Sequence, residues 1–184
     1  MALVIAHRTA AALAPENSLR GIEQAALCHA NWVEMDVRLS RDGELILMHD
    51  ERVDRTSSGC GPVGETSLEE LKDLHLRNRD GSLDQSSTVP TLQEAVSLAR
   101  ELGLGLVVEM KEEGLEGLLA ESISGEDCMV TSFYHASLCE LSEISSLKTG
   151  IIISALPIYP LRLALEAGAS AIFPRRVNAR LFKE

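Results

Sequence analysis

The sequence predicts an α/β fold organised around a parallel sheet. Short apolar runs alternate with helical patterns, and from Gly105 onward the strand candidates begin at nearly equal intervals. Single helices between successive strands indicate parallel βαβ units. Six parallel strands are expected to begin near Leu3, Trp32, Gly105, Cys128, Thr149 and Ala169. They could form an open sheet or most of a barrel, because a closed barrel needs about eight strands.

A seventh strand is expected to run antiparallel to its neighbour. Trp32–Leu39 and Glu44–Met48 flank Asp42-Gly43, which is a strong hairpin signal. If these two residues form the whole turn, Asp36 faces His49, and cross-strand partners lie on the same side of a sheet. A three-residue loop would shift the register by one and turn His49 away.

Helices are expected over about residues 19–26, 92–102, 136–144 and 161–167. Thr91 with Glu94 three residues later forms a capping box, which predicts the start of the second helix. Residues 51–90 are rich in Gly, Ser, Asp and Arg, and we expect an excursion with one helix near Leu68–Leu76. The chain is therefore interpreted as a single domain, 1–184, with an inserted small subdomain at about 51–90.

The composition limits the classes of partner. The net charge of −11 repels a polyanion, which argues against a nucleic-acid partner. The apolar run Ala2–Ala6 is too short for a signal sequence, and no stretch approaches the roughly 20 apolar residues of a membrane span. We therefore expect a cytoplasmic protein with no membrane span.

Charged residues inside strands are the most informative feature. Glu34 and Asp36 share one face of their strand, and Glu109 and Lys111 share one face of another. Three carboxylates pointing towards a barrel axis are costly unless something compensates their charge. A divalent cation is the natural compensator, since hard cations prefer carboxylate oxygens. The alternative is a solvated sheet end in which Glu109 and Lys111 form a plain ion pair.

His7-Arg8 ends the first strand, at the rim where barrel sites are built. A histidine exchanges protons near neutral pH, and an arginine can grip phosphate oxygens with two hydrogen bonds. With His49 and the carboxylates, this set suits phosphoryl transfer: a metal polarises the phosphate, one histidine activates the nucleophile and the other protonates the leaving alkoxide. Taken alone, a His-Arg pair is more often a surface feature.

Other polar segments have simpler interpretations. We expect Asp50 to stabilise the turn after His49, and Arg55 to touch substrate or only to order the excursion. Pro15–Ser18 is explained as a helix start. Ser132–Tyr134 ends a strand at the same rim and would either line a pocket or pack in the ordinary way.

These motifs together resemble the glycerophosphodiester phosphodiesterase family in order and spacing. The motifs are His7-Arg8, Pro15-Glu-Asn-Ser18, Glu34-x-Asp36, Asp42-Gly43, His49-Asp50, Arg55-Thr56, Pro90-Thr-Leu92, Glu109-x-Lys111 and Ser132-Phe133. Any one motif is weak, but the ordered set covers most of the chain and is specific.

The resemblance implies a TIM-type β/α barrel of the phospholipase C-like phosphodiesterase kind. It places a small inserted subdomain between the His49-Asp50 strand and the Glu109 strand. It also implies a divalent cation, Ca²⁺ or Mg²⁺, held by Glu34, Asp36 and Glu109. This ligand set agrees with the strand-face argument above.

The resemblance further implies His7 and His49 as the acid/base pair, with Arg8 and Lys111 near the substrate phosphate. The expected reaction is hydrolysis of a small-molecule glycerophosphodiester to an alcohol and glycerol 3-phosphate. Two alternatives stay open. One is a phospholipase- or lyase-like phosphodiesterase on the same barrel, which would give a cyclic phosphate. The other is a catalytically inactive barrel fragment with a binding or assembly role.

The sequence departs from the family pattern in two places. Thr9 stands where the pattern has glycine, and a β-branched residue does not easily take a positive φ, so we expect a reshaped first loop. The family also continues with a strand carrying Trp-Thr and a last strand ending in Thr-Asp, and neither motif is present. We therefore expect an irregular barrel lacking its last two strands, with an open edge that a second copy in a homo-oligomer could cover.

Overall fold

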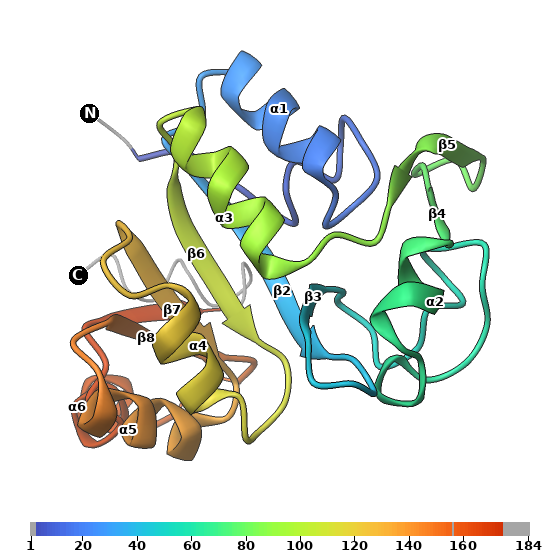
Figure 1. The fold of residues 1–184 in the computed structure, drawn as a ribbon. Coiled ribbons are helices and arrows are strands. Elements are labelled where there is room, and N and C mark those ends of the chain that lie inside the picture. Colours follow the sequence, from blue (N-terminus) through green and yellow to red (C-terminus); the bar gives the residue numbers. More distant parts are fainter. Residues whose placement is uncertain (1–2, 156, 175–184) are drawn as a thin grey trace.

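The computed structural model describes residues 3–155 and 157–174 (Figure 1). Six strands pair side by side in chain order, and every neighbouring pair is parallel. They are β1 (Ile5–Ala6), β2 (Trp32–Leu39), β6 (Gly105–Met110), β7 (Cys128–Ser132), β8 (Lys148–Ile153) and β9 (Ala171–Pro174). A strand order that never reverses is typical of a barrel rather than of a doubly wound open sheet. The six predicted parallel strands are confirmed, and over the described residues they form an incomplete β/α barrel.

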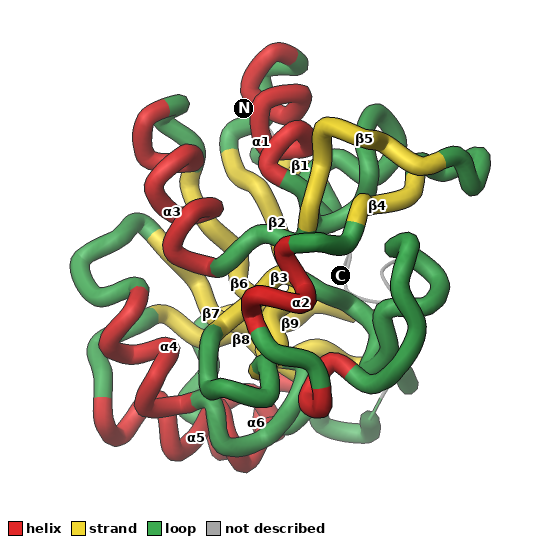
Figure 2. The backbone as a smooth tube through the Cα atoms, turned by 45° about the vertical axis from the view of Figure 1, so that its right-hand side comes forward, coloured by secondary structure: helices red, strands yellow, loops and turns green. Residues whose placement is uncertain are grey.

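Helices lie around the outside of this sheet (Figure 2). They are α1 (Leu19–Leu27), α3 (Leu92–Glu101), α4 (Glu116–Ser122), α5 (His135–Ile144) and α6 (Pro160–Glu166). The predicted capping box is present: the Glu94 amide donates to the Thr91 hydroxyl, and the Thr91 amide donates to the Glu94 carboxylate. Within the described ranges, no helix is both long and apolar enough to cross a bilayer.

The main core fills the space between the sheet and these helices. Val33, Met35 and Val37 of β2 are fully buried there, as are alternate residues of β6 such as Val108. Because successive side chains of a strand point to opposite faces, the residues between them point to the inside of the barrel. The core therefore fixes which face of β2 and β6 carries polar side chains.

Of the two hairpin registers that the sequence leaves open, the structure has the one with a three-residue loop, and Asp36 does not face His49. Strand β3 (Leu45–Leu47) pairs antiparallel with β2, with Val37 opposite Leu47. The Ser40 amide donates to the Glu44 carbonyl, so the loop has three residues, and Gly43 takes the left-handed conformation (φ 86°) at its end. A two-residue turn of the favoured kind would need a positive φ at Asp42 as well.

The excursion carries more structure than the single helix expected. It contains the 3₁₀ turn Val63–Glu65, the helix α2 (Leu68–Lys72) and a separate two-stranded sheet of β4 (His75–Arg77) and β5 (Leu83–Thr88). The expected helix near Leu68–Leu76 therefore ends early, and its last residues form a strand. A second apolar cluster of Ile46, Met48, Val53, Val63, Leu71, Leu76 and Val89 holds the segment together. Its division from the barrel as a subdomain stays a prediction.

The first loop contains three consecutive left-handed residues, Arg8, Thr9 and Ala10, with φ of 48°, 54° and 66°. Thr9 takes a positive φ although it is β-branched, so the reason for expecting a reshaped first loop is wrong. Hydrogen bonds from the Thr9 amide to the Glu34 carbonyl (2.8 Å) and from the Ser18 amide to the Thr9 hydroxyl (2.9 Å) hold it there. Strain of this kind persists only where surrounding contacts over-determine the backbone.

Close packing of α1 on this loop gives a stability prediction. A Cβ built on Gly21 would lie 1.8 Å from the Thr9 carbonyl oxygen, whereas one built on Gly117 in α4 meets nothing within 4 Å. We expect Gly21→Ala to lower the free energy of unfolding by at least about 2 kcal/mol. The matched Gly117→Ala should raise it by about 0.5–1 kcal/mol, because alanine is the better helix former. Urea denaturation of both variants measures this, and a stable Gly21→Ala protein would contradict the described packing.

Candidate active site

Three carboxylates meet on the inner face of the barrel. Glu34 and Asp36 come from β2 and Glu109 from β6, and Asp36 is the direct register partner of Glu109. One oxygen from each lies within 4.8 Å of the others, and all three residues are at most 9% exposed. The structure thus brings together the three residues predicted to hold a metal.

Two of these carboxylates have close partners. Lys111 Nζ lies 2.6 Å from Glu109 Oε1 and 3.6 Å from Asp36 Oδ1. The Asn17 side-chain amide donates to Asp36 (2.8 Å), and Arg8 Nε lies 3.6 Å from the same carboxylate. These groups neutralise and orient Asp36 and Glu109, so the remaining charge of the cluster is that of the third carboxylate.

Glu34 is the carboxylate left without full compensation. Its Oε2 accepts the Arg8 amide at 2.6 Å, but its Oε1 is buried with no hydrogen-bond partner among the described residues. Burial is the largest cause and repulsion from Asp36 the second; together they raise the pKa of Glu34 to about 8. A buried oxygen that lacks a hydrogen-bond partner indicates that the site binds a further group, such as an ion or a ligand.

This donor set fits a hard divalent cation. All three candidate ligands are carboxylate oxygens, the ligands that calcium and magnesium prefer, and none is a thiolate or imidazole. A cation bound by Glu34, Asp36 and Glu109 would compensate the Oε1 atom of Glu34. The ion-pair alternative accounts for Glu109 and Lys111 but leaves this oxygen unexplained.

The two predicted acid/base histidines lie on either side of the carboxylates. His7 lines a cavity of about 860 Å³, and His49 lines one of about 710 Å³; Glu109 and Phe133 line both. His7 Nε2 is 3.9 Å from Glu34 Oε2, and its side chain is 73% exposed. The protein atoms around the imidazole still displace part of its hydration, and this desolvation together with the neighbouring Arg8 charge lowers the pKa of His7, so its neutral form is favoured.

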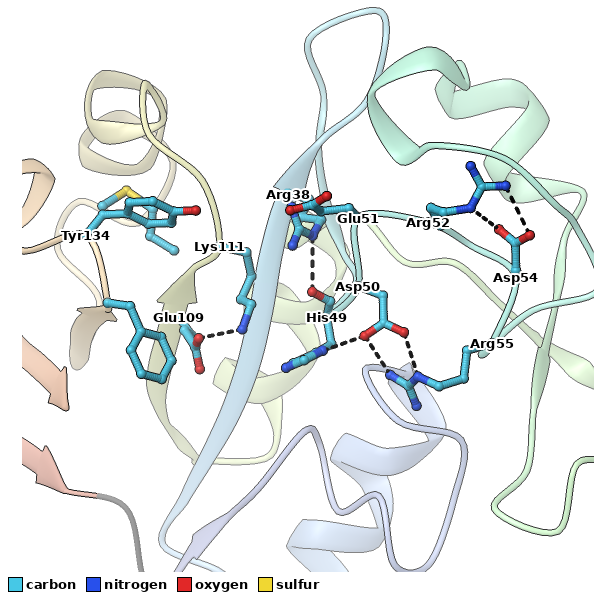
Figure 3. Close-up of a pocket in the computed structure, with 12 residues that line it drawn as sticks. Arg38, His49, Asp50, Glu51, Arg52, Asp54, Arg55, Glu109, Lys111 and Tyr134 are labelled. Atoms are coloured by element: carbon cyan, nitrogen blue, oxygen red, sulfur yellow. Dashed lines mark hydrogen bonds and ion pairs between the residues drawn. The ribbon is translucent and has the colours of Figure 1, made fainter. Parts of the chain in front are cut away.

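His49 reaches the pocket for a different reason than the one predicted. The chain leaves β3 at Leu47, so the hairpin register no longer sets the direction of this side chain. Arg38 Nε donates to the His49 carbonyl (3.1 Å), which fixes its backbone, and His49 Nδ1 lies 2.6 Å from Asp50 Oδ1. His49 and Lys111 both line this pocket, and Figure 3 shows the imidazole pointing away from the Arg55 side of Asp50.

The two predicted phosphate-binding cations both contact carboxylates. Arg8 Nη1 is 3.3 Å from Glu16 Oε1, while its buried Nε has no hydrogen-bond partner within the part of the chain that is described. Lys111 Nζ lies 5.9 Å from the centroid of the Phe133 ring. Phe133 and Tyr134 line the pocket, as the pocket-lining interpretation of Ser132–Tyr134 predicts. Figure 3 shows Tyr134 at the edge of this pocket.

The sequence does not reveal the site contacts of Glu16 and Asn17, and for Arg55 it leaves open whether the residue touches substrate or only orders the excursion. Asn17 lies in the predicted helix start, but it takes a left-handed φ of 54°, its side-chain NH2 donates to the Asp36 carboxylate, and its side-chain oxygen accepts the Asp36 amide. Glu16 and Arg55 are hydrogen-bonded to each other across 39 positions. Their presence in the resembling motifs was a signal, but nothing local in the sequence linked them.

The raised pKa of Glu34 predicts a pH-dependent response to cations. Because the folded state binds the Glu34 proton more tightly than the unfolded state, the stability of the cation-free protein falls as pH rises from about 4.5 to about 8. Adding Ca²⁺ or Mg²⁺ should raise the Tm by several degrees near pH 8 and by less near pH 5, since protons compete with the cation.

Thermal melts of the wild type and Glu34→Gln between about pH 5 and pH 8 test this prediction. The variant should lose both the decline with pH and most of the cation response. Equal cation responses of the two proteins at pH 8 would show that Glu34 is not a ligand.

Comparison with known proteins identifies relatives that cover most of the chain. Residues 7–161 match the Glycerophosphoryl diester phosphodiesterase family. The glycerophosphodiester phosphodiesterase of Caldanaerobacter subterraneus subsp. tengcongensis is 32% identical over 186 residues, covering 96% of this chain and 76% of the relative. YhdW of Bacillus subtilis is 35% identical over 158 residues, covering 81% of this chain and 65% of that protein.

A solved structure is similar over the same region. The Oleispira antarctica phosphodiesterase, in complex with the product sn-glycerol-3-phosphate, superposes with a TM-score of 0.85 at 30% identity, covering 95% of this chain and 75% of that one. The chain thus spans roughly two thirds to three quarters of these relatives. By sequence match and by fold, the chain belongs to the glycerophosphoryl diester phosphodiesterase family, a family of phosphoric diester hydrolases.

Proposed function

We propose that this protein hydrolyses glycerophosphodiesters to an alcohol and glycerol 3-phosphate, using a divalent cation, Ca²⁺ or Mg²⁺, and two histidines. The observation that carries the proposal is the buried carboxylate cluster between His7 and His49, in which one Glu34 oxygen has no partner among the residues described. The product glycerol 3-phosphate bound to the related Oleispira antarctica phosphodiesterase supports the substrate class.

The substrate phosphate would lie between the two histidines, beside the carboxylates. A cation held by Glu34, Asp36 and Glu109 would draw electron density from the phosphate oxygens. Arg8 and Lys111 would hold the remaining phosphate charge, because both cations already face this cluster. In binding substrate, each would exchange part of its contact with a carboxylate for one with the phosphate.

The histidines would move the protons. His7, whose pKa is lowered, would accept a proton from the attacking water as the new phosphorus–oxygen bond forms. His49, protonated on both ring nitrogens, would donate its Nε2 proton to the alkoxide as the bond from phosphorus to the alcohol oxygen breaks, and it would keep the proton on Nδ1. Its Nδ1 stays directed at Asp50, so the Nε2 atom is free to face the substrate. One water is consumed, and the two products are the alcohol and glycerol 3-phosphate.

Two further expectations stay predictions. A cytoplasmic location is one, and the finding that no described helix could span a bilayer is compatible with it. A homo-oligomer that covers the open edge of the barrel is the other.

The proposed reaction predicts release of glycerol 3-phosphate from glycerophosphocholine and glycerophosphoethanolamine in Ca²⁺ or Mg²⁺ but not in EDTA. His49→Ala should lower kcat by about 10²–10⁴-fold, the usual loss of an acid/base group. Glu34→Ala should abolish cation-dependent activity, because it removes a ligand. The control is Arg100→Ala, which breaks an exposed ion pair with Glu126 and should leave kcat unchanged.

Product analysis separates the alternatives. Accumulation of a cyclic phosphate would favour the lyase-like reaction over hydrolysis. A folded protein that binds the cations but forms neither product would refute the proposed reaction and favour the binding role.

A further inference from the structure

A row of alternating charges leads away from His49, and the proposed reaction gives no role to its members beyond Asp50. Asp50 lies beside His49, Arg55 lies beyond Asp50, and Glu16 lies beyond Arg55. Figure 3 shows Asp50 between the imidazole and the Arg55 guanidinium. Glu16 belongs to the loop before α1, whereas Asp50 and Arg55 follow β3. The row therefore joins the start of the excursion to the first loop of the barrel.

The Arg55 guanidinium makes two hydrogen bonds to each of its two carboxylate partners. Its Nε and Nη2 donate to the two oxygens of Asp50 at 2.6 and 3.0 Å. Its Nη1 and Nη2 donate to the two oxygens of Glu16 at 2.9 and 2.7 Å. Two-point contacts fix the plane of a carboxylate, which a single contact does not. Arg55 thereby fixes the orientation of Asp50, and Glu16 fixes that of Arg55.

The row remains ionised at neutral pH. Hydrogen bonds from Arg55 and then from His49 outweigh partial burial and hold the pKa of Asp50 well below its usual range. Burial would raise the pKa of Glu16, but contacts with Arg55 and Arg8 lower it overall. Asp50 is thus a permanent acceptor for the His49 Nδ1 proton.

Simple stabilisation accounts poorly for this arrangement. Arg55 is 49% exposed, and exposed ion pairs contribute about 0–1 kcal/mol. A second arginine of equal exposure, Arg20 (50%), joins α1 to the excursion through Asp84 with one hydrogen bond at 2.6 Å. Linking the two parts of the chain therefore does not require a doubly paired arginine beside a histidine. The Arg55 row differs from the Arg20 contact in that it ends at His49.

We propose that Arg55 and Glu16 are positioning residues, which hold the Asp50 carboxylate so that His49 keeps a proton on Nδ1 and presents Nε2 to the substrate. A neutral imidazole carries its proton on one of two nitrogens, and the partner of one nitrogen decides which. If Asp50 rotated away, His49 would populate the other tautomer and other ring orientations. The consequence for catalysis rests on the proposed role of His49 in the reaction above.

Kinetics of Arg55→Ala, Arg55→Lys, Glu16→Gln and the matched control Arg20→Ala test the proposal. Arg55→Ala should lower kcat about 10- to 100-fold with KM changed less than about threefold, because proton transfer rather than binding is impaired. Arg55→Lys should recover little, since an ammonium cannot make two forked contacts. Glu16→Gln should fall between Arg55→Ala and the wild type, and Arg20→Ala should stay within about twofold.

Nitrogen-15 NMR of labelled histidine gives a readout that a purely structural role would not move and that needs no turnover. The wild type and Arg20→Ala should show His49 as the Nδ1–H tautomer when neutral. Arg55→Ala should show a mixture of tautomers. Circular dichroism and thermal melts establish that each variant is folded, and Arg55→Lys serves as the second variant if Arg55→Ala is not.

The outcomes separate this proposal from the proposed function. An unchanged His49 tautomer in folded Arg55→Ala and Arg55→Lys overturns the positioning role, whatever the kinetics. Wild-type kcat in both variants overturns it as well. If the wild type released no glycerol 3-phosphate, the proposed function would fail, but the tautomer measurement would still decide whether Arg55 and Glu16 orient His49.

Discussion

The burial of three carboxylates on two neighbouring strands is the constraint on which the rest of the site depends. Asp36 and Glu109 are direct partners across β2 and β6, and Glu34 lies two residues away on the same face. Such a cluster is unfavourable unless its charge is compensated. Asp36 and Glu109 are contacted by Lys111, Arg8 and Asn17. One buried oxygen of Glu34 has no such contact among the described residues, and a cation would compensate it.

The surrounding polypeptide is organised to bring compensating and reacting groups to this cluster. The backbone of the first loop is left-handed at Arg8, Thr9 and Ala10. In this conformation the Arg8 amide donates to the Glu34 carboxylate and the Thr9 amide donates to the Glu34 carbonyl. The excursion delivers Arg55, which reaches back to Glu16 in the barrel. Both elements act at the C-terminal ends of the strands, where barrels of this kind place their chemistry.

Much of this could be predicted from sequence because it follows from period-two alternation. Apolar Val33, Met35 and Val37 fix the buried face of β2, so the carboxylates between them must share the other face. The hairpin register could not be settled, since it depends on whether Asp42 takes a positive φ. Strand β5 was missed because Leu83–Thr88 is mostly polar. The Glu16–Arg55 contact is purely tertiary, and no local pattern encodes it.

The most direct test of the central claim is a crystal structure of the wild type with Mn²⁺, located by anomalous scattering. Manganese prefers the same oxygen ligands as magnesium and calcium. The account predicts one peak about 2.0–2.6 Å from an oxygen of each of Glu34, Asp36 and Glu109. A structure in which Mn²⁺ binds elsewhere, with Lys111 still against Glu109 and the Glu34 oxygen unoccupied, would contradict it.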